Sequence, residues 1–145
     1  MTLRDLLLHE TERAYDWDEM CMKAATRGLT TEAARRSTDG VWHCPIWSII
    51  DHVARCDLMY MIQAFGDPPK PVAEPGDTIE SLLEYLEACH AYRVHCLEQI
   101  AEDDLAKPVP TAWHGESAAN LFWTMIQHDV SHAGQITVIR EALGV

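Results

Sequence analysis

Two histidines in the last third of the chain, His128 and His132, stand four residues apart. On an α-helix this spacing places both imidazoles on one face, a single turn apart, where they can hold one metal ion. Both histidines belong to a row of residues, spaced alternately four and three apart, that would form the core-facing seam of such a helix. Its members are Leu121, Met125, His128, His132, Gln135 and Ile139. The alternative is a pair of partly buried histidines that hydrogen-bond to their neighbours or to water.

A second stretch of the chain echoes this pattern. Residues 47–56 (WSIIDHVARC) align with residues 123–132 (WTMIQHDVSH), and each begins with a tryptophan. His52 then falls on His128, so three imidazoles converge at mid-bundle if both helices turn these faces inward. Three histidines with open positions for water are typical of a catalytic metal site, whereas unpartnered imidazoles in an apolar seam would be costly. The sequence therefore predicts a metal site formed by His52, His128 and His132.

Four further side chains are candidates for this site. Cys56, which aligns with His132, either completes a closed site of three nitrogens and one sulfur, an arrangement that favours zinc, or is a packed thiol beside the site. Trp47 and Trp123 lie five residues before their histidines and either wall a pocket or pack in the core. Gln135, on the same seam, is a candidate for a polar contact near the site.

Other polar residues are expected to lie away from the chemistry. The remaining histidines lack comparable pairing and are predicted at the surface or in linkers: His9, His43, His90, His95 and His114. Asp51 and Asp129 adjoin candidate ligands, but neighbouring residues on a helix point about 100° apart. We therefore expect each of these carboxylates to be solvated or to contact another helix, rather than to orient an imidazole.

Capping residues and helix breakers divide the chain into four long helical segments. The first segment runs from Leu3 to Arg27 and starts with a capping box of Thr2 and Asp5, and the second runs from Pro45 to the residue before Gly66. The third is capped by Asp77 and ends near Glu102. The fourth runs from Glu116–Ser117 to the residue before Gly144. Strand signals are nearly absent, because alternating runs of β-branched residues do not occur. We therefore expect an all-α protein, most simply a four-helix bundle.

The linker between the second and third segments predicts how they are oriented. Residues 67–77 (DPPKPVAEPGD) contain four prolines and should be extended. Eleven extended residues reach roughly 36 Å, whereas a helix of 21 residues is about 32 Å long. The linker can therefore cross the whole bundle and let the two helices lie parallel, which gives an up-down-down-up topology.

Composition narrows the class of protein. The 145 residues suit a single domain over 1–145, and a hydrophobic content of 48% excludes a disordered chain. The formal net charge of −12 argues against nucleic acid and against an acidic membrane surface as partners. No run approaches the ~20 apolar residues of a membrane span. Five cysteines without a C-x-x-C pair, and a first stretch unlike a signal peptide, predict reduced thiols in the cytoplasm.

These residues together resemble the DinB-like (DinB/YfiT-like) superfamily of metalloenzymes. Residues 128–136 (HDVSHAGQI) are close to its H-x-x-x-H-x-G-Q-[IL] signature on the last helix, and residues 45–60 (PIWSIIDHVARCDLMY) look like its second-helix motif. The resemblance spans essentially the whole chain. It implies an up-down-down-up four-helix bundle, a divalent metal, often nickel or zinc, on His52, His128 and His132, and frequently a homodimer. Characterised members include thiol S-transferases, which implies a low-molecular-weight thiol as cosubstrate.

The expected function is that of a metal-dependent enzyme that acts on a small molecule by thiol transfer or hydrolysis. A competing interpretation is a stress-associated bundle whose metal is structural, or which binds a small ligand without turnover, and a third interpretation has no metal. Apolar residues on the first and third helical segments add to the expectation of a dimer: Leu6, Leu7, Leu8, Leu82, Leu83 and Leu86.

Overall fold

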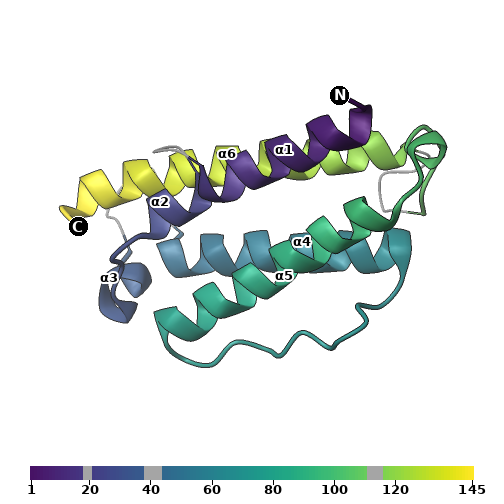
Figure 1. The fold of residues 1–145 in the computed structure, drawn as a ribbon. Coiled ribbons are helices and arrows are strands. Elements are labelled where there is room, and N and C mark those ends of the chain that lie inside the picture. The colour runs from purple at the N-terminus through teal and green to yellow at the C-terminus, as the bar shows by residue number, and fades with distance from the viewer. Residues whose placement is uncertain (18–20, 38–43, 111–115) are drawn as a thin grey trace.

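The structure is a computed structural model that describes residues 1–17, 21–37, 44–110 and 116–145. Four long helices lie side by side within these ranges (Figure 1): α1 (Leu3–Asp16), α4 (Ile46–Phe65), α5 (Ile79–Gln99) and α6 (Ala118–Leu143). Shorter elements connect them: α2 (Met22–Thr26), α3 (Thr31–Arg35) and the 3-10 turn η1 (Glu102–Asp104). The described residues contain no β-strand, only an isolated bridge between Pro108 and Ser117. The prediction of an all-α fold is confirmed.

Most helix ends follow the capping signals of the sequence. The Thr2 hydroxyl accepts from the N–H of Asp5, whose carboxylate accepts from the N–H of Thr2, so the predicted capping box is present. Ser117 caps α6 through the N–H of Asn120. Gly66 and Gly144 end α4 and α6 with φ of +92° and +69°, values that favour glycine because other residues are strained there.

Two predicted boundaries are wrong. The first predicted helix, Leu3 to Arg27, is divided, because α1 ends at Asp16 and α2 starts after Cys21, whose Sγ accepts from a backbone N–H as a helix cap. A cysteine is a weak hydrogen-bond acceptor and not a usual N-cap, so the sequence carries no clear signal for this break. Helix α5 is capped by the Thr78 hydroxyl and not by Asp77, a shift of a single residue.

Contacts at both ends show that α4 and α5 run in the same direction. Near their starts, the Arg35 guanidinium lies 4.4 Å from the ring centre of Trp47 and 3.5 Å from the carboxylate of Asp77. Near their ends, the Tyr92 hydroxyl donates to the carbonyl of Gly66 at 2.5 Å. The linker that joins them returns along the bundle, and α1 and α6 run the opposite way (Figure 1).

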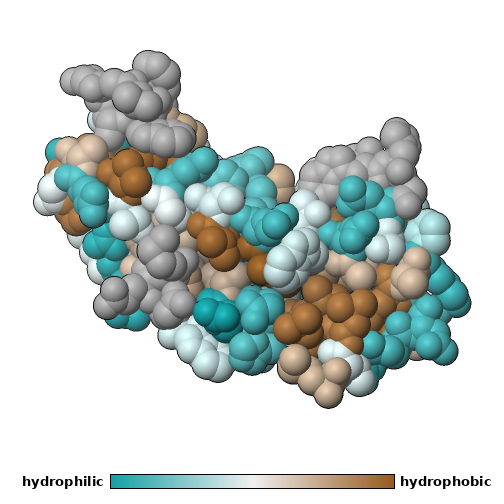
Figure 2. All heavy atoms as spheres, turned by 90° about the horizontal axis from the view of Figure 1, so that it is seen from above, coloured by the Kyte–Doolittle hydropathy of each residue, from teal (hydrophilic) through white to brown (hydrophobic). Residues whose placement is uncertain are grey.

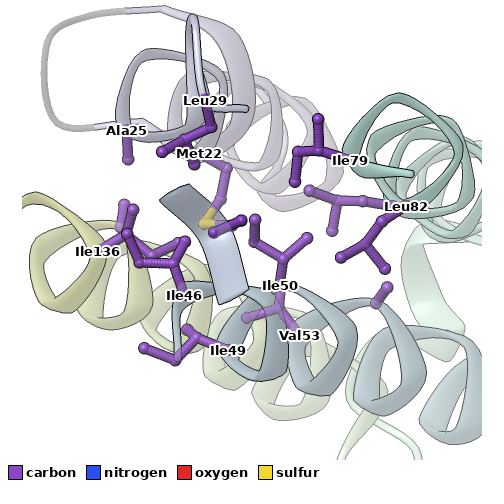
Figure 3. Packing of buried hydrophobic residues seen from close by; sticks show 14 of the residues in the cluster. Met22, Ala25, Leu29, Ile46, Ile49, Ile50, Val53, Ile79, Leu82 and Ile136 are labelled. Carbon is purple, nitrogen blue, oxygen red and sulfur yellow. The ribbon is translucent and has the colours of Figure 1, made fainter. Parts of the chain in front are cut away.

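Two apolar clusters fill the bundle, one toward each end. In the first, side chains from α2, α4, α5 and α6 meet (Figure 3), among them Met22, Ile46, Ile50, Leu82 and Ile136. The second is formed by residues such as Leu7, Met61, Leu97, Leu121 and Phe122. Near the border between the two clusters, α4, α5 and α6 each carry one buried charged residue: Asp57, Arg93 and Asp129. No helix of the described residues is long and apolar enough to cross a membrane.

Candidate metal centre

The three predicted imidazoles meet between α4 and α6. His52 lies near the middle of α4, and its Nε2 is 3.2 Å from Nε2 of His128 on α6. His132, one turn further along α6, places its own Nε2 3.1 Å from the same atom of His128. The helices therefore bring one nitrogen from each ring toward a common point, with ring centres 4.4–5.1 Å apart.

This cluster lies at the bundle surface, and not in the core as the seam predicted. His52 is exposed, and His128 and His132 are half-buried. Leu121, Met125 and Ile139 of the predicted seam are buried, but between them the buried face of α6 runs through Asp129 and Ala133 and not through the two histidines. The imidazoles consequently open toward solvent, where a small molecule can reach them.

The spacing of these nitrogens fits ligands of one metal ion. Two nitrogens bound at about 2.0–2.1 Å, at angles between octahedral and tetrahedral, lie about 2.9–3.4 Å apart. The observed separations of 3.1 and 3.2 Å fall inside this range. The donor set agrees with it, because neutral imidazole is a common ligand of zinc, nickel and related divalent ions.

Hydrogen bonding and burial keep His132 and His128 in the form that binds metal. The Nδ1–H of His132 donates to Oε1 of Gln135 at 2.7 Å, which leaves the lone pair of the neutral ring on Nε2, facing the cluster. Gln135 thus contacts one of the candidate ligands through its amide oxygen. Burial, followed by the neighbouring His132 and His52, lowers the pKa of His128 to about 4, and burial also lowers the pKa of His132. Nδ1 of His128 is buried without a hydrogen-bond partner.

Cys56 also adjoins the cluster. Its Sγ is 3.6 Å from Nδ1 and 3.8 Å from Nε2 of His52, one turn earlier on α4. One ligand atom each from His52, Cys56 and His128 lie within 4.8 Å of one another. Burial raises the pKa of the Cys56 thiol, and the nearby Asp57 raises it further. The thiol is therefore protonated at neutral pH unless a cation binds it.

The other predicted residues lie elsewhere. Trp47 packs against the first apolar cluster beneath the Arg35 guanidinium, and Trp123 is 46% exposed on α6. Asp51 forms a surface ion pair with Arg55 at 2.9 Å. A hollow of about 460 Å³ lies between α1, α2 and α5, and none of the three imidazoles lines it.

The remaining histidines divide into three groups. His9 and His95 are exposed, as predicted, and His43 and His114 lie outside the described residues. The prediction for His90 is wrong, because this ring is buried and stacks on Tyr15 with ring centres 4.0 Å apart. Burial, followed by the charges of Arg93 and Lys23, lowers the pKa of His90 to about 3, so the ring is neutral.

A buried charge cluster beside the imidazoles was missed by the sequence analysis. Arg93 of α5 is fully buried and pairs with Asp57 of α4 at 3.3 Å and with Asp129 of α6 at 2.5 Å. It also donates to Nδ1 of His90 at 3.0 Å. Asp129 directly follows His128 in the sequence. Its pair with Arg93 of α5 agrees with the expectation that this carboxylate contacts another helix. The signal was present, since Arg93 occupies a core position of its helix, four residues after Cys89 and three before Cys96.

Comparison with known proteins places these features in a family. A model of the DinB superfamily matches residues 14–136, a span that contains His52, His128, His132 and Gln135. Neither the curated proteins nor the solved structures gave a match. Because the family match covers most of the sequence, the chain belongs to the DinB superfamily.

Proposed function

We propose that this chain is a divalent-metal-dependent enzyme that acts on a small molecule by thiol S-transfer or hydrolysis. His52, His128 and His132 would hold the metal, with nickel or zinc as the expected ion and a low-molecular-weight thiol as the expected cosubstrate. The proposed architecture is a single domain over residues 1–145, a four-helix bundle of up-down-down-up topology whose Pro-rich linker, residues 67–77, is the crossover.

One observation carries the proposal, namely the convergence of three imidazole nitrogens, at separations of 3.1 and 3.2 Å, on a face that opens to solvent. Neutral imidazoles repel no cation, and three of them leave at least one position of a four-coordinate ion for a water or a substrate. When bound, the metal supplies a Lewis acid that turns a thiol or a water into a nucleophile at neutral pH.

The chain's own residues prepare this centre. Gln135 accepts the Nδ1–H of His132 and so directs the lone pair of Nε2 toward the cluster. Arg93 holds Asp57 on α4 and Asp129 on α6, and thereby fixes the two helices that carry the imidazoles. Both groups are positioning residues, because neither reaches the point where the three nitrogens meet.

A structural metal centre without turnover is the second candidate, and Cys56 favours it. A sulfur ligand added to three nitrogens would fill a tetrahedral ion, and closed four-coordinate sites are typical of structural zinc. The proximity of Cys56 to His52 and His128 supports this alternative.

Metal analysis of protein purified without a His tag tests the centre. We expect one divalent ion per chain in the wild type, loss of that ion in His128→Ala, and full retention in the matched control His95→Ala, an exposed histidine on α5. Substoichiometric metal in the wild type, or full retention in His128→Ala, would contradict the proposed ligands.

Turnover separates the two candidates. The metal-replete protein is assayed against a panel of low-molecular-weight thiols with electrophilic acceptors, and against hydrolysable esters and amides. An enzyme shows turnover that chelation and His128→Ala both abolish. A chain that binds one ion, gains stability from it and converts none of these compounds favours the structural centre.

We further propose a homodimer, located in the cytoplasm, with no nucleic-acid or membrane partner. The net charge of −12 supports the absence of nucleic-acid and acidic-membrane partners. The five cysteines, all within the described residues and all free, support a location in the cytoplasm. The leucines used to predict the dimer support it less, because Leu7, Leu82 and Leu86 are buried in the core. Better candidates for an interface are the exposed apolar side chains on α6, namely Trp123, Val130 and Val138.

Apolar patches are visible among hydrophilic side chains on the face over α1 and α6 (Figure 2). Light scattering or sedimentation measures the mass in solution, and a sharp monomer would contradict the dimer.

A further inference from the structure

We propose that Cys56 is a thiolate ligand of the same metal centre, so that the resting site holds three nitrogens and one sulfur. This inference rests on the metal centre proposed above. It adds the residue that decides whether a coordination position is open to substrate.

The first support is the position of the sulfur. A sulfur bound at about 2.3 Å and a nitrogen bound at about 2.0–2.1 Å to one tetrahedral ion lie about 3.5 Å apart. Sγ of Cys56 lies 3.6 and 3.8 Å from the two ring nitrogens of His52. Together with His128 these residues offer ligand atoms within 4.8 Å of one another. Nε2 is the nitrogen of His52 that faces the cluster, and its 3.8 Å from Sγ is about 0.3 Å longer than this separation, so a small movement of the thiol brings the sulfur to a shared ion.

The second support is the symmetry between the two helices. Helix α4 carries His52 and Cys56 one turn apart, and α6 carries His128 and His132 one turn apart. Each helix therefore presents an i,i+4 pair of side chains that can chelate. The two pairs face each other through the contact of His52 with His128.

The third support comes from the other thiols, which differ from Cys56 in their surroundings. Cys21, Cys89 and Cys96 are buried in the apolar interior, as expected for cysteines that act as small hydrophobes. Cys44 is exposed. Cys56 is half-buried, and of the described cysteines it is the one whose sulfur adjoins an imidazole of the cluster.

Binding requires a balanced exchange of a proton for a metal ion. The S–H bond of Cys56 breaks, its proton goes to water, and the electron pair left on the sulfur forms the bond to the metal without any change of oxidation state. Four protein ligands fill a tetrahedral ion such as zinc, so a substrate thiol can bind only after Cys56 leaves. A six-coordinate ion such as nickel keeps two positions open. Cys56 thereby regulates access to the centre.

Cobalt(II) is the probe, because a thiolate ligand gives it a charge-transfer absorption in the near ultraviolet. All measurements use the Cys44→Ser parent, which removes the exposed thiol. We expect the absorption in the parent and in the control Cys96→Ser, and its loss in Cys56→Ser, which retains the visible bands of cobalt bound to histidine. Removing a group that only hydrogen-bonds to a ligand already weakens metal binding by about tenfold or more. Removing a ligand in Cys56→Ser should therefore lower zinc affinity by at least about tenfold.

Two further measurements complete the test. Added 2-mercaptoethanol should restore the charge-transfer absorption in Cys56→Ser, because the vacated position accepts an external thiol. Alkylation of Cys56 by iodoacetamide in the parent, followed by mass spectrometry, should be slowed at least tenfold by zinc, and this comparison requires no change at the site.

The outcomes distinguish this inference from the proposed function. Stoichiometric cobalt without charge-transfer absorption, or an absorption that survives Cys56→Ser, overturns the sulfur ligand. If His128→Ala then abolishes cobalt binding, the histidine centre stands without Cys56. A parent that binds no cobalt overturns both.

Discussion

Arg93→Met is expected to destabilise the metal-free chain by about 3–5 kcal/mol, the usual cost of removing one partner from a buried ion pair. Arg93 is 0% exposed and Asp57 and Asp129 are each 2% exposed, so the substitution leaves two carboxylates without a countercharge inside the bundle. Methionine keeps the apolar stem of arginine but lacks the guanidinium group, so lost packing adds to the cost of the two unpaired carboxylates. The chain should still fold, because domains of this size are stable by about 5–15 kcal/mol.

The assay is urea unfolding followed by circular dichroism, with a chelator present so that metal binding does not contribute. With a slope of about 2 kcal/mol/M, a loss of about 4 kcal/mol lowers the midpoint by about 2 M urea. Arg55→Met is the matched control, because Arg55 also contacts two carboxylates, Asp51 and Glu74, each at 2.9 Å. That pair is on the surface, so its loss should cost less than about 1 kcal/mol.

A charge-removal variant completes the experiment. Combining Arg93→Met with Asp57→Asn and Asp129→Asn removes all three charges, and the two asparagines keep the shape of the aspartates, so at least half of the lost stability should return. If Arg93→Met and Arg55→Met lower the urea midpoint equally, the reasoning from burial is refuted.

The remaining predictions concern single side chains. His90→Gln should make the chain less sensitive to acid than the wild type. A histidine whose folded pKa is about 3 stabilises the fold above the unfolded pKa of about 6.5, and it loses about 2 kcal/mol of that contribution by pH 5. Thermal unfolding at pH 5 and pH 7.5 measures this loss, and the control His95→Gln, at an exposed position, should leave the difference between the two pH values unchanged. Gly134→Ala should raise stability by up to about 1 kcal/mol, because an added Cβ on this helical residue meets nothing within 4 Å; an equal or lower urea midpoint would be the contrary result. Ser117→Ala should cost about 1 kcal/mol, because it removes the hydroxyl that caps α6; unchanged unfolding would show that the cap contributes little.

The sequence was most informative where a local signal fixes the backbone. The capping box of Thr2 and the termination of α4 and α6 at Gly66 and Gly144 were predicted correctly, because hydroxyl caps and positive φ depend on the residue itself. The meeting of His52 with His128 was anticipated from the repeated pattern of the two helices, and their nitrogens are 3.2 Å apart.

The sequence was least informative where the outcome depends on helix rotation and on partners far along the chain. The buried face of α6 runs through Asp129 and Ala133, which directly follow His128 and His132 and point about 100° away from them. The pattern of residue types did not show which of these two rows faces the core, so the imidazoles were expected too deep. The spacing of Arg93 from Cys89 and Cys96 indicated a core position, but its two carboxylates lie 36 residues away in either direction, and pairing across such distances leaves no local pattern.

The charged layer between the two apolar clusters also restricts how the helices can slide. Moving α4 or α6 along its axis by one turn, about 5.4 Å, would place a carboxylate against hydrocarbon and leave Arg93 facing aliphatic side chains. The observed axial alignment of the three helices places Arg93 beside both carboxylates, much as a single polar residue sets the register of a coiled coil. His128 directly precedes Asp129 of this layer, and His52 lies five residues before Asp57, about 1.4 turns along α4. We therefore expect the imidazoles to face each other before metal binds, so that a metal ion meets ligands that are already assembled.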